Sequence, residues 1–100
     1  MGYKDGVYSI WERKLTIERY YQMPEALIDN IDKVHTTEMG QVRIKQNLNL
    51  KIDDVVNWCK QAITEATKIN REGKNWYVEF DNAVITINAH SYTIITAHKN

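Results

Sequence analysis

Apolar and polar residues alternate most regularly near the C-terminus, as they do in β-strands with one buried face. Trp76, Val78 and Phe80 are separated by polar or amphipathic residues. Asp81-Asn82 follows them, and both residue types tolerate the positive φ angles of a two-residue hairpin turn. The pattern therefore predicts an antiparallel hairpin that turns at residues 81–82.

This turn also predicts the register of the hairpin. It places three pairs of apolar residues on one face: Phe80 with Ala83, Val78 with Ile85, and Trp76 with Ile87. The turn and the apolar pattern agree, which favours this pairing, because a slip by one residue would move every side chain to the other face. The opposite face then carries four residues: Tyr77, Glu79, Thr86 and Asn88.

A third strand is predicted over residues 92–98, and two registers are open for it. A loop of residues 90–91 would bring three residues to the core face: Tyr92, Ile94 and Thr96. In that register Thr93 joins the polar face with Thr86 and Asn88.

A loop one residue longer would bring Thr93, Ile95 and Ala97 to the core face. The polar face would then gain three residues: Tyr92, Thr96 and His98. Because positions 94 and 95 are both isoleucine, periodicity does not choose between the registers, and burial of the strand on both faces is also compatible with the pattern.

The spacing of apolar residues is helical in the first part of the chain. Ser9 and Glu12 form a capping-box pattern, which predicts a first helix over residues 10–22. Pro24 suits the first position of a second helix, where its missing N–H costs nothing. Apolar residues at helical spacing extend this second helix to about Val34.

A third helix is predicted after a threonine cap, Thr36 or Thr37. Gly40 weakens a helix, so we expect it to serve close packing. The inner face is expected to hold Met39, Val42 and Leu48, with Ile44 placed less clearly.

The fourth helix has the strongest pattern, with Asp53 as its cap and a span of about residues 54–70. Its buried stripe is expected to contain six residues: Val55, Val56, Cys59, Ile63, Ala66 and Ile69. Gly73 suits a C-cap or a nearby turn.

These elements predict an α+β domain in which three to four helices precede a three-stranded antiparallel meander, and the long fourth helix covers its apolar face. The 100 residues are expected to form one domain. It would consist of an N-terminal segment (1–23), a helical part (24–70) and the sheet (75–99).

Composition narrows the class of protein. Thirteen basic and thirteen acidic residues give a net charge of zero, which argues against a strong non-specific field for nucleic acid or membrane but allows a local basic patch. The lone Cys59 excludes an internal disulfide and favours a reducing, cytoplasmic location. No apolar run approaches the roughly 20 residues of a membrane span. The first nine residues, MGYKDGVYS, contain no hydrophobic segment of signal-peptide type, so no signal peptide is expected.

No cofactor or metal is expected. His35, His90 and His98 are scattered along the chain, and no second cysteine is present. Metal sites usually place their ligands at short, regular spacings. Cys59 lies on an apolar helical stripe and is expected to be a buried structural thiol.

Four blocks of sequence resemble a family of short bacterial and phage proteins that is catalogued as a domain of unknown function. They are residues 35–48 (HTTEMGQVRIKQNL), 54–60 (DVVNWCK), 73–78 (GKNWYV) and 85–99 (ITINAHSYTIITAHK). The resemblance runs from about Leu27 to the end and leaves the first 23 residues outside it.

A fainter similarity is to the barnase, EndoU, colicin and RelE group of metal-independent ribonucleases. It lies in a helical region with a histidine, followed by a small antiparallel sheet whose last strand reads TIITA. This similarity implies a toxin-like ribonuclease, and it is an analogy of fold.

RNA cleavage without a metal requires a proton acceptor, a proton donor and a cation for the phosphate. The candidate catalytic residues are His35, Arg43, Thr96 and His98. The candidate substrate-binding residues are Lys45, Thr86, Asn88, Tyr92 and Thr93.

Among these, His35 is expected to be the acid or base and Arg43 the phosphate clamp. Arg43 and Lys45 would point about 160° apart on a regular helix, and Arg43 is expected to face the sheet. The enzyme hypothesis requires the His35 ring to lie within about 10 Å of Arg43 or the last strand.

The alternative is a non-enzymatic interaction protein, such as a phage-encoded inhibitor of a host or defence protein. The aromatic N-terminus or an edge of the sheet would contact the partner or a second copy in a homodimer. The aromatic residues concerned are Tyr3, Tyr8, Trp11, Tyr20 and Tyr21. Zero net charge favours this alternative, whereas the histidine, threonine and arginine positions favour action on RNA.

Overall fold

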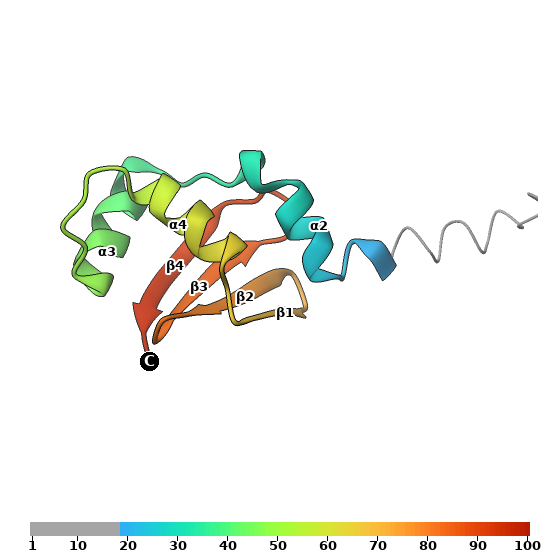
Figure 1. Cartoon of the computed structure of the whole chain (residues 1–100). Coiled ribbons are helices and arrows are strands. Elements are labelled where there is room, and N and C mark those ends of the chain that lie inside the picture. Colours follow the sequence, from blue (N-terminus) through green and yellow to red (C-terminus); the bar gives the residue numbers. More distant parts are fainter. Residues whose placement is uncertain (1–18) are drawn as a thin grey trace, which may run out of the picture.

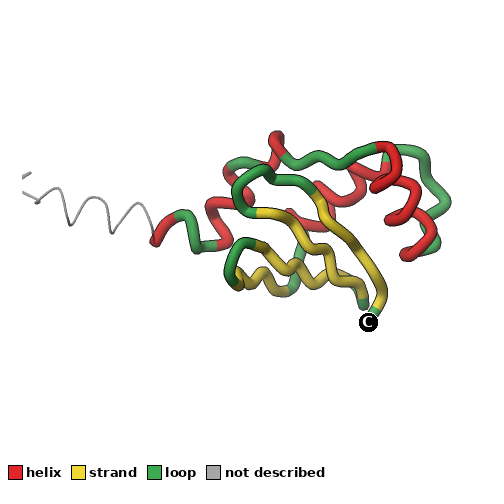
Figure 2. The backbone as a smooth tube through the Cα atoms, turned by 180° about the vertical axis from the view of Figure 1, so that it is seen from behind, coloured by secondary structure: helices red, strands yellow, loops and turns green. Residues whose placement is uncertain are grey.

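Helices cover one face of a four-stranded antiparallel sheet in the computed structural model, which describes residues 19–100 (Figures 1 and 2). The helices are α2 (Pro24–Asp29), the 3₁₀ turn η1 (Ile31–Lys33), α3 (Glu38–Leu48) and α4 (Val55–Thr64). The strands are β1 (Lys68–Glu72), β2 (Asn75–Phe80), β3 (Ala83–Asn88) and β4 (Ile94–Lys99), in that spatial order. The α+β class is confirmed, but the sheet has one strand more than predicted. Residues 10–18 of the helix predicted over residues 10–22 lie outside the described residues.

The additional strand is β1, in a segment predicted to be the end of the fourth helix. That helix, α4, stops at Thr64, and Ile69 pairs with Val78 of β2. Gly73 has a φ of 58° and lies in the two-residue turn that brings Glu72 opposite Asn75. Ile69 fits the apolar pattern of a helix as well as that of a strand, so pairing with β2 decides its conformation.

The central hairpin has the predicted register. Phe80 pairs with Ala83, Val78 with Ile85, and Trp76 with Ile87. Asp81 and Asn82 have φ angles of 47° and 65°, the positive values that a type I′ turn requires at both central positions. The prediction from turn chemistry and apolar alternation is therefore confirmed.

Strand β4 uses both of the registers that periodicity left open. Ile94 pairs with Ile87 as a two-residue loop would require, whereas Ala97 pairs with Ile85 as the longer loop would require. A β-bulge separates the two, and Ile95 is the extra residue. Ile94 and Ala97 are consequently both buried, while Ile95 is 49% exposed, so the strand is not buried on both faces.

The helices begin close to the predicted residues, but α2 ends earlier than predicted. Pro24 is the first residue of α2, as expected, but the α-helix ends at Asp29 and a 3₁₀ turn completes the segment. Thr37 caps α3 by accepting a hydrogen bond from the Gly40 amide. Asp54 caps α4 in place of the predicted Asp53.

The inner face of α3 is formed by Ile44 and Leu48, which are buried. Met39 and Val42 were expected there but are 69% and 55% exposed. Ile44 and Leu48 are four residues apart and share one face, and α3 packs this face against β4. Asn47 strengthens the contact by donating from Nδ2 to the Ala97 carbonyl at 3.1 Å.

The core lies between the helices and the inner face of the sheet (Figure 1). Its largest fully buried side chains include Trp76, Leu27, Ile44, Ile63 and Ile85. Cys59 is fully buried among them, and burial raises the pKa of its thiol to about 12. The expected structural role of this cysteine is consistent with that environment.

Candidate functional site

The loop between β3 and β4, residues 89–93, is held in shape by Asn88. The Asn88 Oδ1 accepts hydrogen bonds from the amides of His90 and Ser91, each at 2.9 Å. The Tyr92 amide donates to the Asn88 carbonyl at 2.8 Å, and Tyr92 has a φ of 59°. A non-glycine residue in this left-handed region is uncommon and is retained only where surrounding contacts impose it.

His35 lies on one side of this loop and forms a bridge with Thr93. The His35 amide donates to the Tyr92 carbonyl at 3.1 Å, and the Ile94 amide donates to the His35 carbonyl at 2.8 Å. The segment between η1 and α3 thereby docks against the start of β4. The proximity to the last strand that the enzyme hypothesis requires is present.

The His35 ring takes part in a chain of side-chain hydrogen bonds. Nδ1 lies 2.8 Å from the Lys33 carbonyl, which can only accept, so Nδ1 carries the proton. In the neutral ring Nε2 then accepts from the Thr93 hydroxyl at 3.2 Å. Thr93 Oγ1 is also 2.7 Å from Ser91 Oγ. Both ring nitrogens of His35 are thus engaged within the protein.

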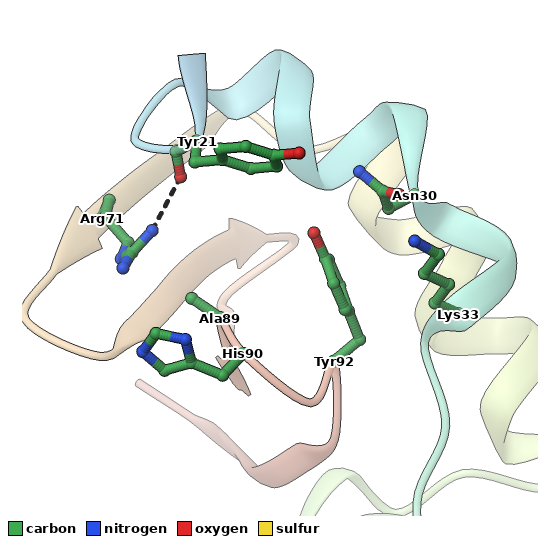
Figure 3. Close-up of a pocket in the computed structure, with 7 residues that line it drawn as sticks. All are labelled: Tyr21, Asn30, Lys33, Arg71, Ala89, His90 and Tyr92. Atoms are coloured by element: carbon green, nitrogen blue, oxygen red, sulfur yellow. Dashed lines mark hydrogen bonds between the residues drawn. The ribbon is translucent and has the colours of Figure 1, made fainter. Parts of the chain in front are cut away.

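A cleft of about 410 Å³ lies against the same loop, between the loop, the α2–η1 segment and β1 (Figure 3). Its lining residues are Tyr21, Asn30, Lys33, Arg71, Ala89, His90 and Tyr92. Three of them are basic or can become cationic, two are phenols, and none is acidic. The chemistry of this lining suits an anion that carries a flat ring.

Arg71 is held in place at one end of the cleft. Its Nη1 donates to the Tyr21 carbonyl at 2.7 Å (Figure 3). Its Nε donates to the Gly73 carbonyl at 2.9 Å. The guanidinium lies 5.4 Å from the centre of the Trp76 ring. These bonds use two of the five N–H groups of an arginine, so the others can bind a ligand from a fixed position.

Tyr92 projects from the loop into the cleft, toward Tyr21 and α2 (Figure 3). The Lys33 Nζ lies 5.8 Å from the centre of the Tyr92 ring. Burial raises the pKa of Tyr92, the nearby Tyr21 raises it further, and Arg71 opposes the rise. The Tyr92 hydroxyl therefore keeps its proton near neutral pH and is available as a hydrogen-bond donor.

Tyr21 and Asn30 close the α2 side of the cleft. The neighbouring Tyr20 hydroxyl donates to the Asp29 carboxylate, which raises the pKa of Tyr20 to about 12 and ties residues 20–21 to α2. Asn30 donates from Nδ2 to the Ala26 carbonyl at 2.7 Å. This bond fixes the orientation of the Asn30 amide beside the cleft.

The predicted site residues are spread over three places. Tyr92 lines the cleft, Thr93 belongs to the His35 chain, and Asn88 shapes the loop between them. Thr86 and Thr96 pair with each other on the face of the sheet opposite the helices.

His98 lies on that same open face, opposite Val84. It follows Thr93 by five residues, about 16 Å along a strand at about 3.3 Å per residue. Because His35 contacts Thr93, the two histidines are too far apart to act on one phosphate.

The third place is α3, which carries Arg43 and Lys45. Arg43 is exposed and does not face the sheet as expected, because the buried face of the helix is formed by Ile44 and Leu48. Lys45 lies 3.4 Å from the Asp53 carboxylate in an exposed ion pair. The roles assigned to these residues from the sequence stay predictions, and the cleft does not include them.

Six cleft residues were not among the candidates: Tyr21, Asn30, Lys33, Arg71, Ala89 and His90. Arg71 was missed because it was expected to follow the end of a helix, whereas it follows Ile69 by two residues on the inner face of β1. Tyr21 was noted only as part of an aromatic group. His90 and Tyr92 are two residues apart in one turn, a signal that could have drawn attention to this loop.

Among residues 19–100, no group of three or more histidine, cysteine or acidic side chains is placed to hold a metal ion. Within the same residues, no helix has the length and apolar character needed to cross a membrane.

A family model described as "Protein of unknown function (DUF3781)" matches residues 28–98. The chain belongs to the DUF3781 family. The matched region includes α3, α4, the sheet except Lys99 at the end of β4, and every cleft residue except Tyr21. The resemblance to a family of unknown function is thus confirmed.

No curated protein and no solved structure matches the chain. The comparisons therefore give no support to the similarity with the ribonuclease group. The described side chains of this DUF3781 protein are therefore the guide to its function.

Proposed function

We propose that this protein binds single-stranded RNA in the cleft between the α2–η1 segment, β1 and the β3–β4 loop. The observation that carries the proposal is the composition of the lining: Lys33, Arg71 and His90 converge there without a carboxylate. The whole chain has a net charge of zero, so this local excess of positive charge is not a consequence of a basic composition.

The cleft residues match the two chemical parts of a nucleotide. Arg71 presents fixed N–H donors of the kind that bind phosphate oxygens, and Lys33 adds a point charge. Tyr21 and Tyr92 offer aromatic rings of the kind on which unpaired bases stack. A cleft of about 410 Å³ is at the small end of ligand sites, which suits one splayed nucleotide better than a duplex.

The same side chains would support metal-independent cleavage. The 2′-hydroxyl oxygen attacks the adjacent phosphorus while the neutral His90 ring accepts the hydroxyl proton. The bond from phosphorus to the 5′-oxygen breaks, and this oxygen takes a proton from Tyr92 or water. Arg71 and Lys33 stabilise the charge that develops on the phosphate. The products are a 2′,3′-cyclic phosphate and a 5′-hydroxyl end.

We assign proton transfer to His90 and not to His35 for a geometric reason. His90 lines the cleft, whereas both ring nitrogens of His35 already bond to Lys33 and Thr93. In this proposal His35 is a positioning residue. It holds the loop that carries His90 and Tyr92 against the segment that carries Lys33.

The test uses the three histidines, because each of them lies in a different place. Cleavage of a labelled single-stranded RNA is followed in EDTA with wild type, His90→Ala, His35→Ala and His98→Ala. We expect His90→Ala to lower the rate by about 100-fold or more, the usual size of a lost acid–base group. His98→Ala is the matched control, since His98 and His90 are both exposed.

Binding of the same RNA is measured by fluorescence anisotropy with Lys33→Ala and Lys45→Ala. We expect Lys33→Ala to weaken binding about tenfold, as for one lost charged contact, and Lys45→Ala to have little effect. Failure of the folded wild type to bind RNA would refute the proposal. Binding that depends on Lys45 and not on Lys33 would move the RNA site to α3. Cleavage that His35→Ala abolishes and His90→Ala leaves unchanged would return the catalytic role to His35.

A second candidate function is the non-enzymatic interaction protein. The observation in its favour is that Tyr21, Met23 and Ile28 are 52%, 46% and 37% exposed around α2, and exposed apolar side chains close together are typical of protein-binding surfaces. Two results together would support this candidate: the folded wild type does not bind RNA, and a protein partner that it captures is lost in the Met23→Lys variant.

A further inference from the structure

The two edges of the sheet differ in how they are covered. In β4 the Ile94 carbonyl accepts from Thr36 Oγ1, the Ala97 carbonyl accepts from Asn47 Nδ2, and the Ile94 amide donates to His35. Strand β1 forms the other edge. Among the described residues, no comparable hydrogen bond reaches its outer backbone groups. A five-residue edge with free backbone groups is a template for another strand.

The register of the sheet determines which backbone groups of β1 point outward. Phe80 and Ala83 flank the two-residue turn and therefore form a hydrogen-bonded pair. Backbone bonding alternates along a strand, so Val78 and Trp76 also bond to β3. The β2 residues between them, Asn75, Tyr77 and Glu79, bond to β1. Their partners are Glu72, Asn70 and Lys68. The outward amides and carbonyls of β1 therefore belong to Ile69 and Arg71.

We propose that β1 pairs antiparallel with β1 of a second copy of this chain, centred on Asn70. In this register Ile69 lies opposite the partner's Arg71, and the two residues exchange their outward N–H and C=O groups. Asn70 lies opposite the partner's Asn70. The result is one continuous sheet that runs through both copies, related by a two-fold axis through the centre of the strand pair.

Charge complementarity selects a second copy as the occupant. The strand reads Lys-Ile-Asn-Arg-Glu, so pairing about Asn70 sets Lys68 opposite the partner's Glu72, and the symmetry repeats this ion pair. Both side chains are exposed in the single copy and lie on the open face of the sheet. They are directly opposite in non-hydrogen-bonded positions, where side chains are closest.

The other registers with the same hydrogen-bonding parity lack this complementarity. Centring the pair on Ile69 sets Lys68 opposite an asparagine and leaves Glu72 beyond the contact. Centring it on Arg71 sets the two Arg71 side chains against each other, and like charges directly opposite are destabilising. One register alone therefore pairs both charged residues with their opposites.

The inference is independent of the proposed RNA site, because it rests on β1 alone. It has one geometric consequence for that site. Arg71 belongs to β1 and also lines the cleft. The two-fold axis of the strand pair is normal to the sheet, so the helices of both copies cover the same face of the continuous sheet. The two clefts of the dimer would then flank the new strand pair.

The test is analytical ultracentrifugation of the full chain over a concentration series, with charge-reversal variants. We expect a concentration-dependent dimer for wild type. Lys68→Glu and Glu72→Lys should each weaken the dimer by about tenfold or more, because each converts two attractive pairs into two repulsive ones. The double variant Lys68→Glu with Glu72→Lys restores opposite charges and should regain dimerisation. Lys74→Glu is the control, since it makes the same charge change in the β1–β2 turn.

Circular dichroism and melting temperature establish that each variant is folded. The substituted residues are exposed, so the substitutions are expected to leave the fold intact. A wild type that is monomeric at every concentration would overturn the proposal. So would a dimer that Lys68→Glu weakens no more than Lys74→Glu does, or a double variant that remains as weak as the single ones. RNA binding without dimerisation would leave the cleft proposal standing and reject this one.

Discussion

Gly40 shows how a single residue serves a contact between distant segments. A Cβ at this position would lie too close to Thr36 Oγ1 and within 3.3 Å of Thr36 Cβ. The same Thr36 hydroxyl donates to the Ile94 carbonyl at 3.1 Å. The absence of a side chain at Gly40 therefore allows the start of α3 to approach β4, and the sequence-based expectation of close packing is met.

We expect Gly40→Ala to destabilise the fold by about 1–2 kcal/mol. An alanine in a helix ordinarily gains about 1 kcal/mol over glycine, but here the Thr36 hydroxyl must move and its hydrogen bond is lost. The measurement is denaturant unfolding of Gly40→Ala, Thr36→Ala and the double variant. Adding Gly40→Ala to Thr36→Ala should cost clearly less than adding it to wild type, because the closest atom is gone and only Thr37 Oγ1 at 3.2 Å and the Cβ of residue 36 at 3.3 Å remain. Equal costs in both backgrounds would contradict this account.

At the scale of the elements, β1 is a strand although the spacing of its apolar residues predicts a helix. Ala66 and Ile69 continue the stripe of α4, yet β2 offers Ile69 a partner in Val78 and a ladder of backbone hydrogen bonds. A helix extended to residue 70 would forgo both. Gly73 makes the change of direction possible, because its φ of 58° is one that other residues rarely adopt.

We predict that Gly73→Ala lowers stability by about 1 kcal/mol through backbone strain alone. An added Cβ at this position meets no atom within 4 Å, so no steric contact contributes. Gly73→Asn is the matched variant, because asparagine tolerates positive φ, and it should cost clearly less. Thermal or urea unfolding measures both. If the two variants melt alike and close to wild type, the turn does not depend on positive φ.

At the scale of the whole molecule, the core couples folding to pH through one buried thiol. The pKa of Cys59 rises from 9.0 to about 12 on burial. A raised pKa means that the folded state holds the proton more tightly, so the associated stability is complete below pH 9 and is lost as pH rises toward 12. The loss can reach about 1.4 kcal/mol per pH unit.

We therefore expect the free energy of unfolding to fall from about pH 9 upward. Urea unfolding between pH 7 and 11 is the measurement, and Cys59→Ala is the control. The variant should be less stable at pH 7 because of the cavity, but its stability should depend less on alkaline pH. The native thiol should also react with a disulfide reagent only after unfolding. Rapid reaction in the folded protein would contradict the assigned burial.

What the sequence determined by itself was local. Asp81-Asn82 and the alternation of Trp76, Val78 and Phe80 specified a hairpin and its register, because turn geometry and burial of one face are both properties of neighbouring residues. Pro24 and the pair Thr36-Thr37 likewise marked helix starts, since the end of a helix is satisfied by the residues beside it.

Tertiary structure decided whatever depended on a distant partner. The bulge that buries both Ile94 and Ala97, the strand state of Ile69 and the inward face of α3 all follow from packing against other elements. The cleft belongs to the same class, because Lys33, Arg71 and His90 come from three elements that share no spacing in the chain. Periodicity records which residues prefer burial, and only the fold determines what they are buried against.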